Sequence, residues 1–221
     1  VRWQHPSLGI IRPDMFIPLA ESNHLIIPIG EQVLAQACVL TKRLIEEGLF
    51  FGRISVNVSG KQFERPDVVE TINRIINECG VGHQYVELEI TESVLMSNPK
   101  ALGEKLIALK RLGIEVAIDD FGTGYSSLSY LKTFPIDKLK IDQSFVRGID
   151  GDEQDRAIVK AIIAMADALR IKTIAEGIEE TAQALLLKEY GCQQGQGYMY
   201  ARPLSEEKFV EFLKYNEISK S

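Results

Sequence analysis

The feature that most constrains the fold of this 221-residue chain is a repeated alternation of short strand-like segments with amphipathic helical segments. Residues 53–59 and 85–91 alternate apolar and polar side chains at a period of two, which is typical of β-strands. Further strand-like segments follow at residues 115–119, 138–142, 172–176 and 195–200, with one fragment at residues 1–4. Strands that alternate with helices predict a parallel sheet covered by helices.

The helical segments have recognisable boundaries. Residues 67–79 place apolar side chains at helical spacing and end at Gly80, and Asp67 and Glu70 have the spacing of a capping box. A second helix is expected between Asn98 and Gly113. Three more helices are expected around residues 158–169, 182–191 and 205–213.

The spacing of the strands indicates the architecture. Polar residues close six successive strands at intervals of 20 to 36 residues, about one βα unit each. This arrangement predicts an α/β fold, a modified TIM (β/α)8 barrel whose first strand and the start of whose second strand are absent from the chain. An open, doubly wound sheet is the alternative on pattern alone. We expect one domain over residues 1–221, with a frayed tail at 216–221.

Composition excludes several classes of protein. The formal net charge is −6, from 25 basic and 31 acidic residues, so the chain lacks the cationic character of a general DNA- or RNA-binding protein. No apolar run is long enough to span a bilayer, so we expect no membrane contact by this domain. The three cysteines have no metal-binding spacing and predict reduced thiols in a cytoplasmic domain, whose parent protein could still be membrane-anchored.

Polar residues close each predicted strand, at the sheet edge where parallel α/β folds bind their ligands. A single carboxylate there is usually a helix cap or a solvated side chain. Six strand ends that carry polar groups in register favour a functional site instead. These residues are Asn57, Glu89, Asp119, Asp120, Lys140, Glu176 and Gln196.

The chemistry of this set points to metal ions. Four carboxylates that lie close together at the carboxyl ends of the strands do not stay ionised without positive charge beside them. The predicted ligands are all oxygen atoms, which favours two Mg²⁺ or Mn²⁺ ions over zinc. Two such ions polarise a phosphoryl group and acidify a water in phosphodiester hydrolysis, and Lys140 would hold that water or the developing charge.

The segment from Asp119 to Leu128, DDFGTGYSSL, resembles the loop motif of EAL domains, the bacterial cyclic di-GMP phosphodiesterases. The resemblance extends over essentially the whole chain, in order and approximate spacing. Its other motifs are Arg2–Pro6, Phe16–Glu21, Asn57–Ser59, Glu87–Glu92, Lys140–Asp142, Ala175–Glu179 and Gln196–Tyr198 with Pro203.

The resemblance implies hydrolysis of cyclic di-GMP to linear pGpG by a two-metal mechanism in a modified TIM barrel. It implies the metal ligands Asn57, Glu89, Asp119, Asp120 and Glu176. It implies catalytic roles for Lys140, which orients the attacking water, and for Glu176, Gln196 and Glu92, the last of which steadies the loop after Asp119. It implies substrate contacts by Arg2, Asn57, Asp142 and Glu179.

The resemblance also implies partners. The loop formed by Phe121, Gly122, Thr123, Gly124 and Tyr125 is commonly a dimer contact in the family, so a homodimer is expected. A GGDEF or sensor domain is often fused upstream. The family's Glu-Ala-Leu triplet lies just before the residues that match Val1–Trp3, so we expect this chain to be truncated after that motif and to be impaired in activity.

Two alternatives to a phosphodiesterase stay open. One is a catalytically inactive receptor for cyclic di-GMP, which would bind the ligand without hydrolysing it. The other is a regulatory interaction domain that uses its dimer face and no nucleotide. The fold cannot separate these functions, so the site must.

Overall fold

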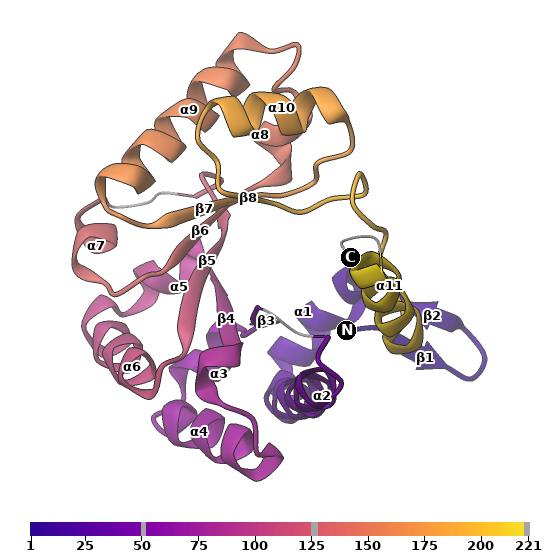
Figure 1. Ribbon diagram of the computed structural model, residues 1–221. Coiled ribbons are helices and arrows are strands. Elements are labelled where there is room, and N and C mark those ends of the chain that lie inside the picture. The colour runs from indigo at the N-terminus through magenta and orange to yellow at the C-terminus, as the bar shows by residue number, and fades with distance from the viewer. Residues whose placement is uncertain (50–51, 125–127, 219–221) are drawn as a thin grey trace.

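A computed structural model of the protein describes residues 1–49, 52–124 and 128–218. Its centre is a six-stranded parallel sheet whose spatial order follows the sequence. The strands are β3 (Ile54–Asn57), β4 (Val86–Thr91), β5 (Glu115–Phe121), β6 (Lys138–Ile141), β7 (Lys172–Ala175) and β8 (Gln194–Gly195). The sheet curls like part of a barrel (Figure 1). The α/β barrel prediction is therefore confirmed, and a doubly wound sheet, whose strand order reverses, is excluded.

The N-terminal fragment behaves differently from the prediction. We expected residues 1–4 to supply part of a sheet strand, but β1 (Trp3–His5) pairs antiparallel with β2 (Gly9–Ile11) in a separate two-stranded sheet. The reason is local, because Gly9 takes a φ of +71° that lets the chain turn back at once. The predicted strand at 195–200 is also shorter, since β8 ends at Gly195.

Helices cover the outer face of the curled sheet (Figure 1). In chain order, the helices of the described residues are α1 (Pro13–Ser22), α2 (Ile26–Glu46), α3 (Gly60–Glu64), α4 (Val68–Cys79), the 3-10 turn η1 (His83–Tyr85), α5 (Glu92–Ser97), α6 (Pro99–Leu112), α7 (Leu128–Thr133), α8 (Gln143–Arg147), α9 (Glu153–Ala168), α10 (Thr181–Glu189) and α11 (Glu206–Ile218). Of these, α1 and α11 lie away from the six-stranded sheet (Figure 1). Every helix that the sequence predicted is present. Among the described residues, no helix is long and apolar enough to cross a membrane.

Helix ends follow the expected chemistry, with one exception. Asn98 caps α6 by accepting a hydrogen bond from the backbone N of Ala101, and Gly113 ends that helix in a left-handed conformation. The capping box expected from Asp67 is absent. Its carboxylate instead accepts from the guanidinium of Arg65, 2.5 Å away, so it is not available to the helix backbone.

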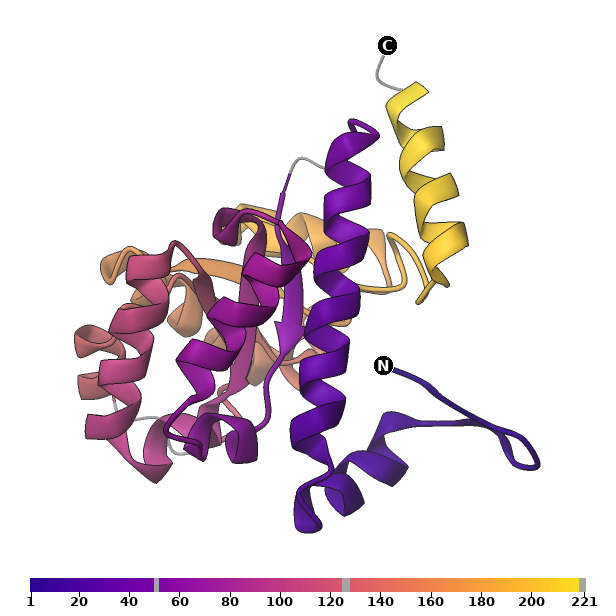
Figure 2. The same cartoon turned by 90° about the horizontal axis from the view of Figure 1, so that it is seen from below.

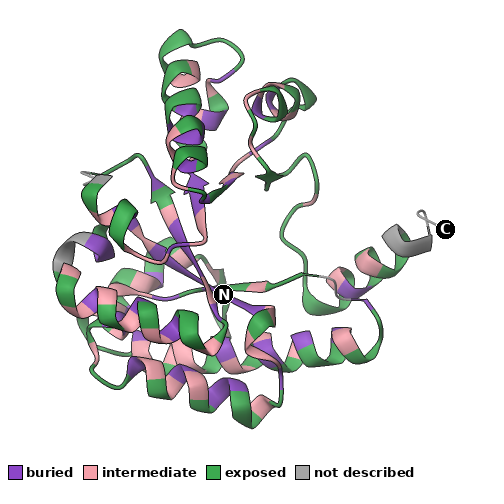
Figure 3. Cartoon of the chain, turned by 60° about the vertical axis from the view of Figure 1, so that its left-hand side comes forward, coloured by how far each residue is buried: buried purple, intermediate pink, exposed green. Residues whose placement is uncertain are grey.

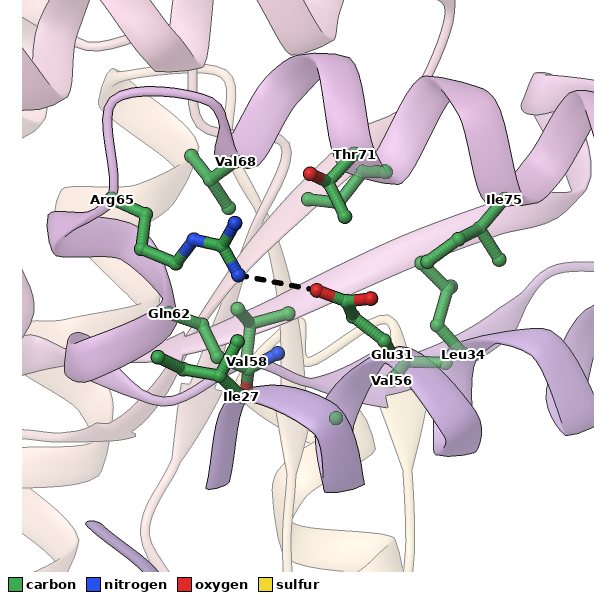
Figure 4. A pocket seen from close by; sticks show the side chains of 12 residues that line it. Ile27, Glu31, Leu34, Val56, Val58, Gln62, Arg65, Val68, Thr71 and Ile75 are labelled. Atoms are coloured by element: carbon green, nitrogen blue, oxygen red, sulfur yellow. Dashed lines mark hydrogen bonds and ion pairs between the residues drawn. The ribbon is translucent and has the colours of Figure 1, made fainter. Parts of the chain in front are cut away.

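The longest helix, α2, packs against α4 and β3. Figure 4 shows this contact, where Arg65 Nη1 lies 3.2 Å from Glu31 Oε1 above a small gap lined by Leu34, Val58 and Ile75. The gap measures about 20 Å³, which is room for about one water molecule. It is a packing void under an ion pair and not a ligand site.

The C-terminal helix α11 lies beside α2 (Figure 2). Leu44 and Val210 are buried in this contact, and Arg43 forms an ion pair with Glu206 at 2.9 Å. The helix continues to Ile218, across the first residues of the predicted tail, and residues 219–221 lie outside the described part of the chain.

The main hydrophobic core lies between the sheet and its helices, where Figure 3 shows the buried residues gathered on the strands. Leu88 in β4 is fully buried there. Its neighbours in sequence, Glu87 and Glu89, point to the opposite face of the strand, because side chains alternate along it. One strand therefore contributes both to the core and to the inside of the curl.

We predict that Leu88→Ala lowers the free energy of unfolding by about 2–5 kcal/mol, because it leaves a cavity in a closely packed core. Urea denaturation followed by circular dichroism measures the effect. Leu185→Ala is the control, since Leu185 is 62% exposed on α10. Equal effects of the two substitutions would contradict this description of the core.

Candidate active site

The centre of the candidate site is the ammonium group of Lys140, which is 4% exposed inside the curl of the sheet. Its Nζ lies 2.8 Å from an oxygen of each of Glu89, Asp119 and Glu176. These side chains come from β4, β5, β6 and the residue after β7, so four adjacent strands meet in one polar cluster. We call these four residues the Lys140 cluster.

Burial and charge have opposing effects on the pKa values of the Lys140 cluster. Burial disfavours the charged ammonium, but the three carboxylates outweigh burial and raise the pKa of Lys140 above its ordinary value. Burial also raises the pKa of Glu176, and the nearby charge of Lys140 opposes that rise. Three carboxylates face one ammonium, so the cluster keeps an excess of negative charge that a cation would neutralise.

Asp120 extends this negative charge toward solvent. Its φ of +53° turns the backbone at the end of β5, so that Asp119 and Asp120 can serve the same site. Oxygen atoms of Asp119, Asp120 and Glu176 lie within 4.8 Å of one another. Burial raises the pKa of Asp120, and the charges of Asp119 and Asp142 raise it further. An all-oxygen donor set of this kind fits a hard divalent cation.

A second layer of polar side chains lies two residues earlier along the same strands. Glu87 Oε1 accepts a hydrogen bond of 2.7 Å from Ser55, and its Oε2 lies 2.7 Å from Nζ of Lys138. Glu87 and Lys138 stand two residues before Glu89 and Lys140, so the period of the strands places both layers on the inner face. The sequence analysis did not include this layer, although the same alternation indicates it.

Glu92 ties the loop after β5 to the sheet. This side chain is 3% exposed, and its Oε2 accepts a hydrogen bond of 3.0 Å from the backbone N of Gly122. A Cβ atom at Gly124 would lie 2.9 Å from Glu92 Oε1, so the loop passes directly over the carboxylate. The contact agrees with the loop-steadying role expected for Glu92, whereas Tyr125 of that loop lies outside the described residues.

A polar pocket of about 260 Å³ adjoins the Lys140 cluster through Glu176. Its walls come from α8, the segment after β7 and the segment after β8. It is lined by Gln143, Arg147, Glu176, Gly177, Glu179, Gln196, Gly197 and Tyr198. The structure thus places the predicted residues Glu179 and Gln196 beside Glu176. Arg147 and Gln143 were missed by the sequence analysis, because no strand end or charge cluster marks them. Tyr198 appeared there only as the end of the Gln196–Tyr198 motif.

Other predicted residues lie at the rim of the site or away from it. Asn57 ends β3 in register with Glu89, and Asp142 caps α8 through the backbone N of Ser144. Arg2 donates a hydrogen bond to the carbonyl of Val1 and lines a different cavity, beside Trp3. No contact among the described residues joins Arg2 to the Lys140 cluster, so its predicted substrate contact stays a prediction.

A model of the EAL domain matches residues 1–203. The chain belongs to the EAL family. The EAL domain is 41% identical over 214 residues to the cyclic di-GMP phosphodiesterase NbdA of Pseudomonas aeruginosa, a match that covers 97% of the chain and 27% of NbdA.

Solved structures similar to this chain belong to the same family. The EAL domain superimposes with a TM-score of 0.91 on the MucR phosphodiesterase in complex with c-di-GMP, at 40% identity over 94% of this chain and 84% of that one. The EAL enzyme Bd1971, bound to cAMP and cyclic di-GMP, gives a TM-score of 0.90 at 35% identity, over 96% of this chain and 58% of that one. The EAL domain spans about a third or less of the length of the first curated relatives.

We predict that Lys140→Met destabilises the EAL domain by about 3 kcal/mol at pH 7, because three buried carboxylates lose their cation. The loss is expected to shrink at pH 5. A carboxyl group whose pKa is raised on folding takes up a proton more readily in the folded state, so stability rises as pH falls.

Urea denaturation at both pH values measures this effect, with Lys188→Met on the exposed surface of α10 as the control. A loss for Lys140→Met that is the same at pH 7 and pH 5 would contradict the proposed charge balance.

Proposed function

We propose that residues 1–221 form a cyclic di-GMP phosphodiesterase domain that hydrolyses one phosphodiester of its substrate to give linear pGpG. The observation that carries the proposal is the Lys140 cluster joined to Asp120, an oxygen-rich site at the carboxyl ends of the strands of an EAL domain. The relatives named as cyclic di-GMP phosphodiesterases support the choice of substrate.

We propose Glu89, Asp119, Asp120 and Glu176 as metal ligands, with Asn57 at the end of β3 as a fifth. Mg²⁺ or Mn²⁺ fits this donor set, and four carboxylates beside one ammonium leave more negative charge than one divalent ion neutralises. When bound, such ions polarise the phosphoryl group and acidify a water. Glu87 and Lys138 lie beneath the ligands and hold the strand side chains in place from below.

Lys140 acts at the attacking water in this proposal. Its raised pKa keeps the ammonium charged at neutral pH, so it does not act as a base. Its three N–H donors face Glu89, Asp119 and Glu176, so one of them would turn from a carboxylate to the water. The oxygen of the water loses a proton and forms a new bond to phosphorus, the bond from phosphorus to the 3′ oxygen breaks, and that oxygen takes up a proton, so the net number of protons is unchanged. Gln196 lies beside Glu176 and helps to orient the water, and Glu92 fixes the adjoining loop.

We predict Mg²⁺-dependent conversion of cyclic di-GMP to pGpG, measured by chromatography, when the domain is expressed with about one further βα unit of its upstream sequence. Glu89→Gln is expected to lower the rate at least about 100-fold, because it removes a metal ligand, and EDTA is expected to abolish turnover. Glu104→Gln on the exposed face of α6 is the control. Circular dichroism confirms that each variant is folded.

The other outcomes identify the alternatives. Binding of cyclic di-GMP without turnover would make the domain a receptor. Neither binding nor turnover would leave a regulatory interaction domain and would overturn the proposal.

We also propose that the domain forms a homodimer through the loop after β5. Thr123 is exposed in this loop, which Glu92 holds from below, so the loop presents a fixed surface to a second copy. We predict a dimer in sedimentation velocity experiments and a monomer for Thr123→Arg, which places a bulky charge in the contact. A monomeric wild-type protein would contradict the dimer but not the phosphodiesterase.

A further inference from the structure

Two of the three cysteines lie on neighbouring helices. Cys38 is in the middle of α2, and Cys79 is the last residue of α4. Both are free thiols in this structure, and neither takes part in the proposed phosphodiesterase chemistry. Cys192 lies at the opposite edge of the sheet, where its thiol donates to the carbonyls of Thr173 in β7 and Gln194 in β8. The two helix cysteines therefore form a pair apart from the third.

The two helices lie side by side (Figure 4), and printed contacts fix which residues meet at the end of α4. The thiol of Cys79 lies 3.7 Å from the carbonyl oxygen of Ala35 in α2. Further along α2, Nζ of Lys42 lies 3.2 Å from the point where a Cβ atom would stand at Gly80. The part of α2 between Ala35 and Lys42 thus lies against the C-terminal end of α4.

Cys38 is the residue of this stretch that faces Cys79. A helical side chain points back over the turn that precedes it, so the carbonyl of Ala35 lies beside residues 38 and 39. Cys38 is fully buried, whereas Val39 is 60% exposed and faces away from the contact. The two thiols accordingly share a hydrogen bond. Two thiols in direct contact across a helix pair need little backbone movement to be joined by a disulfide.

The two thiols differ in exposure, and this difference sets the order in which they react. Burial raises the pKa of Cys38 to about 12, and the neighbouring Cys79 contributes to the rise, so Cys38 stays protonated at neutral pH. Cys79 is only partly buried, at the end of its helix. An incoming molecule therefore reaches Cys79 first, and its thiolate is the attacking species in thiol–disulfide exchange.

We propose that Cys38 and Cys79 form a reversible disulfide site that reacts with low-molecular-weight disulfides. The Cys79 thiolate attacks one sulfur of the small disulfide and forms a mixed disulfide, and the first thiol leaves with the proton that Cys79 lost. The sulfur of Cys38 then attacks Cys79 Sγ, and the second thiol leaves with the proton of Cys38. Two protein thiols are oxidised to one disulfide, and the small disulfide is reduced to two thiols.

The bridge would close a loop that contains β3 and α3, and it would fix α2 to α4. A crosslink between residues that already touch restricts the unfolded chain more than the folded one. Oxidation is therefore expected to raise the Tm of the domain by about 5–15 °C. The inference goes beyond the proposed function and does not depend on it, since neither cysteine belongs to the Lys140 cluster.

The test incubates the domain with oxidised glutathione and follows its intact mass, its peptide map and its Tm. The wild type is expected to lose two hydrogen atoms and to gain a crosslink between the peptides of Cys38 and Cys79, and dithiothreitol is expected to reverse both changes. Cys192→Ser is the matched control and is expected to form the same bridge. Cys38→Ala is expected to stop at a glutathione adduct on Cys79, with no comparable rise in Tm.

Three outcomes would overturn the proposal: a wild type that does not react, a wild type that stops at the adduct on Cys79, and a bridge that includes Cys192. Circular dichroism confirms that each variant is folded, and the peptide map of the wild type decides the question without any variant. None of these measurements uses cyclic di-GMP, so their failure leaves the proposed function standing, and a domain without turnover leaves the disulfide site standing.

Discussion

The architecture of this EAL domain depends on one buried ammonium group held among three carboxylates. Charged side chains are rarely buried, because removal from water costs several kcal/mol for each ion. Lys140 and its partners tolerate burial because each contact is short and because the charges have opposite signs. The same arrangement leaves an excess of negative charge at the carboxyl ends of the strands, where Asp120 adds another carboxylate. Stability and cation binding thus arise from one set of side chains.

Much of the fold was predictable because strand periodicity and strand spacing are local properties of the sequence. Alternation in residues 85–91 indicated which side chains of β4 face inward, and it is confirmed by the ion pair of Glu89 with Lys140 and by the position of Leu88 in the hydrophobic core. The N-terminal hairpin was not predictable in this way. Its short strands have no strong alternation, and their pairing depends on a turn at a single glycine.

The candidate site was predictable to the extent that it lies at strand ends. Glu89, Asp119, Lys140 and Glu176 meet as the parallel sheet requires. The ion pairs of Lys140 were not part of the prediction, since sequence spacing indicates which residues share an edge but not which atoms touch. Arg147 and Tyr198 lie in a short helix and a loop, so their approach to Glu176 depends on tertiary packing that no local pattern records.

The order of the strands has a consequence for how the site forms. Lys140 and Glu89 are 51 residues apart in sequence, and their contact exists only when β4, β5 and β6 are paired in register. Contacts between such distant residues carry a loop-closure cost in entropy, because the chain between them must be held in place. The site therefore forms only when β4 to β7 are paired, and a bound cation would stabilise these four strands together rather than any one of them.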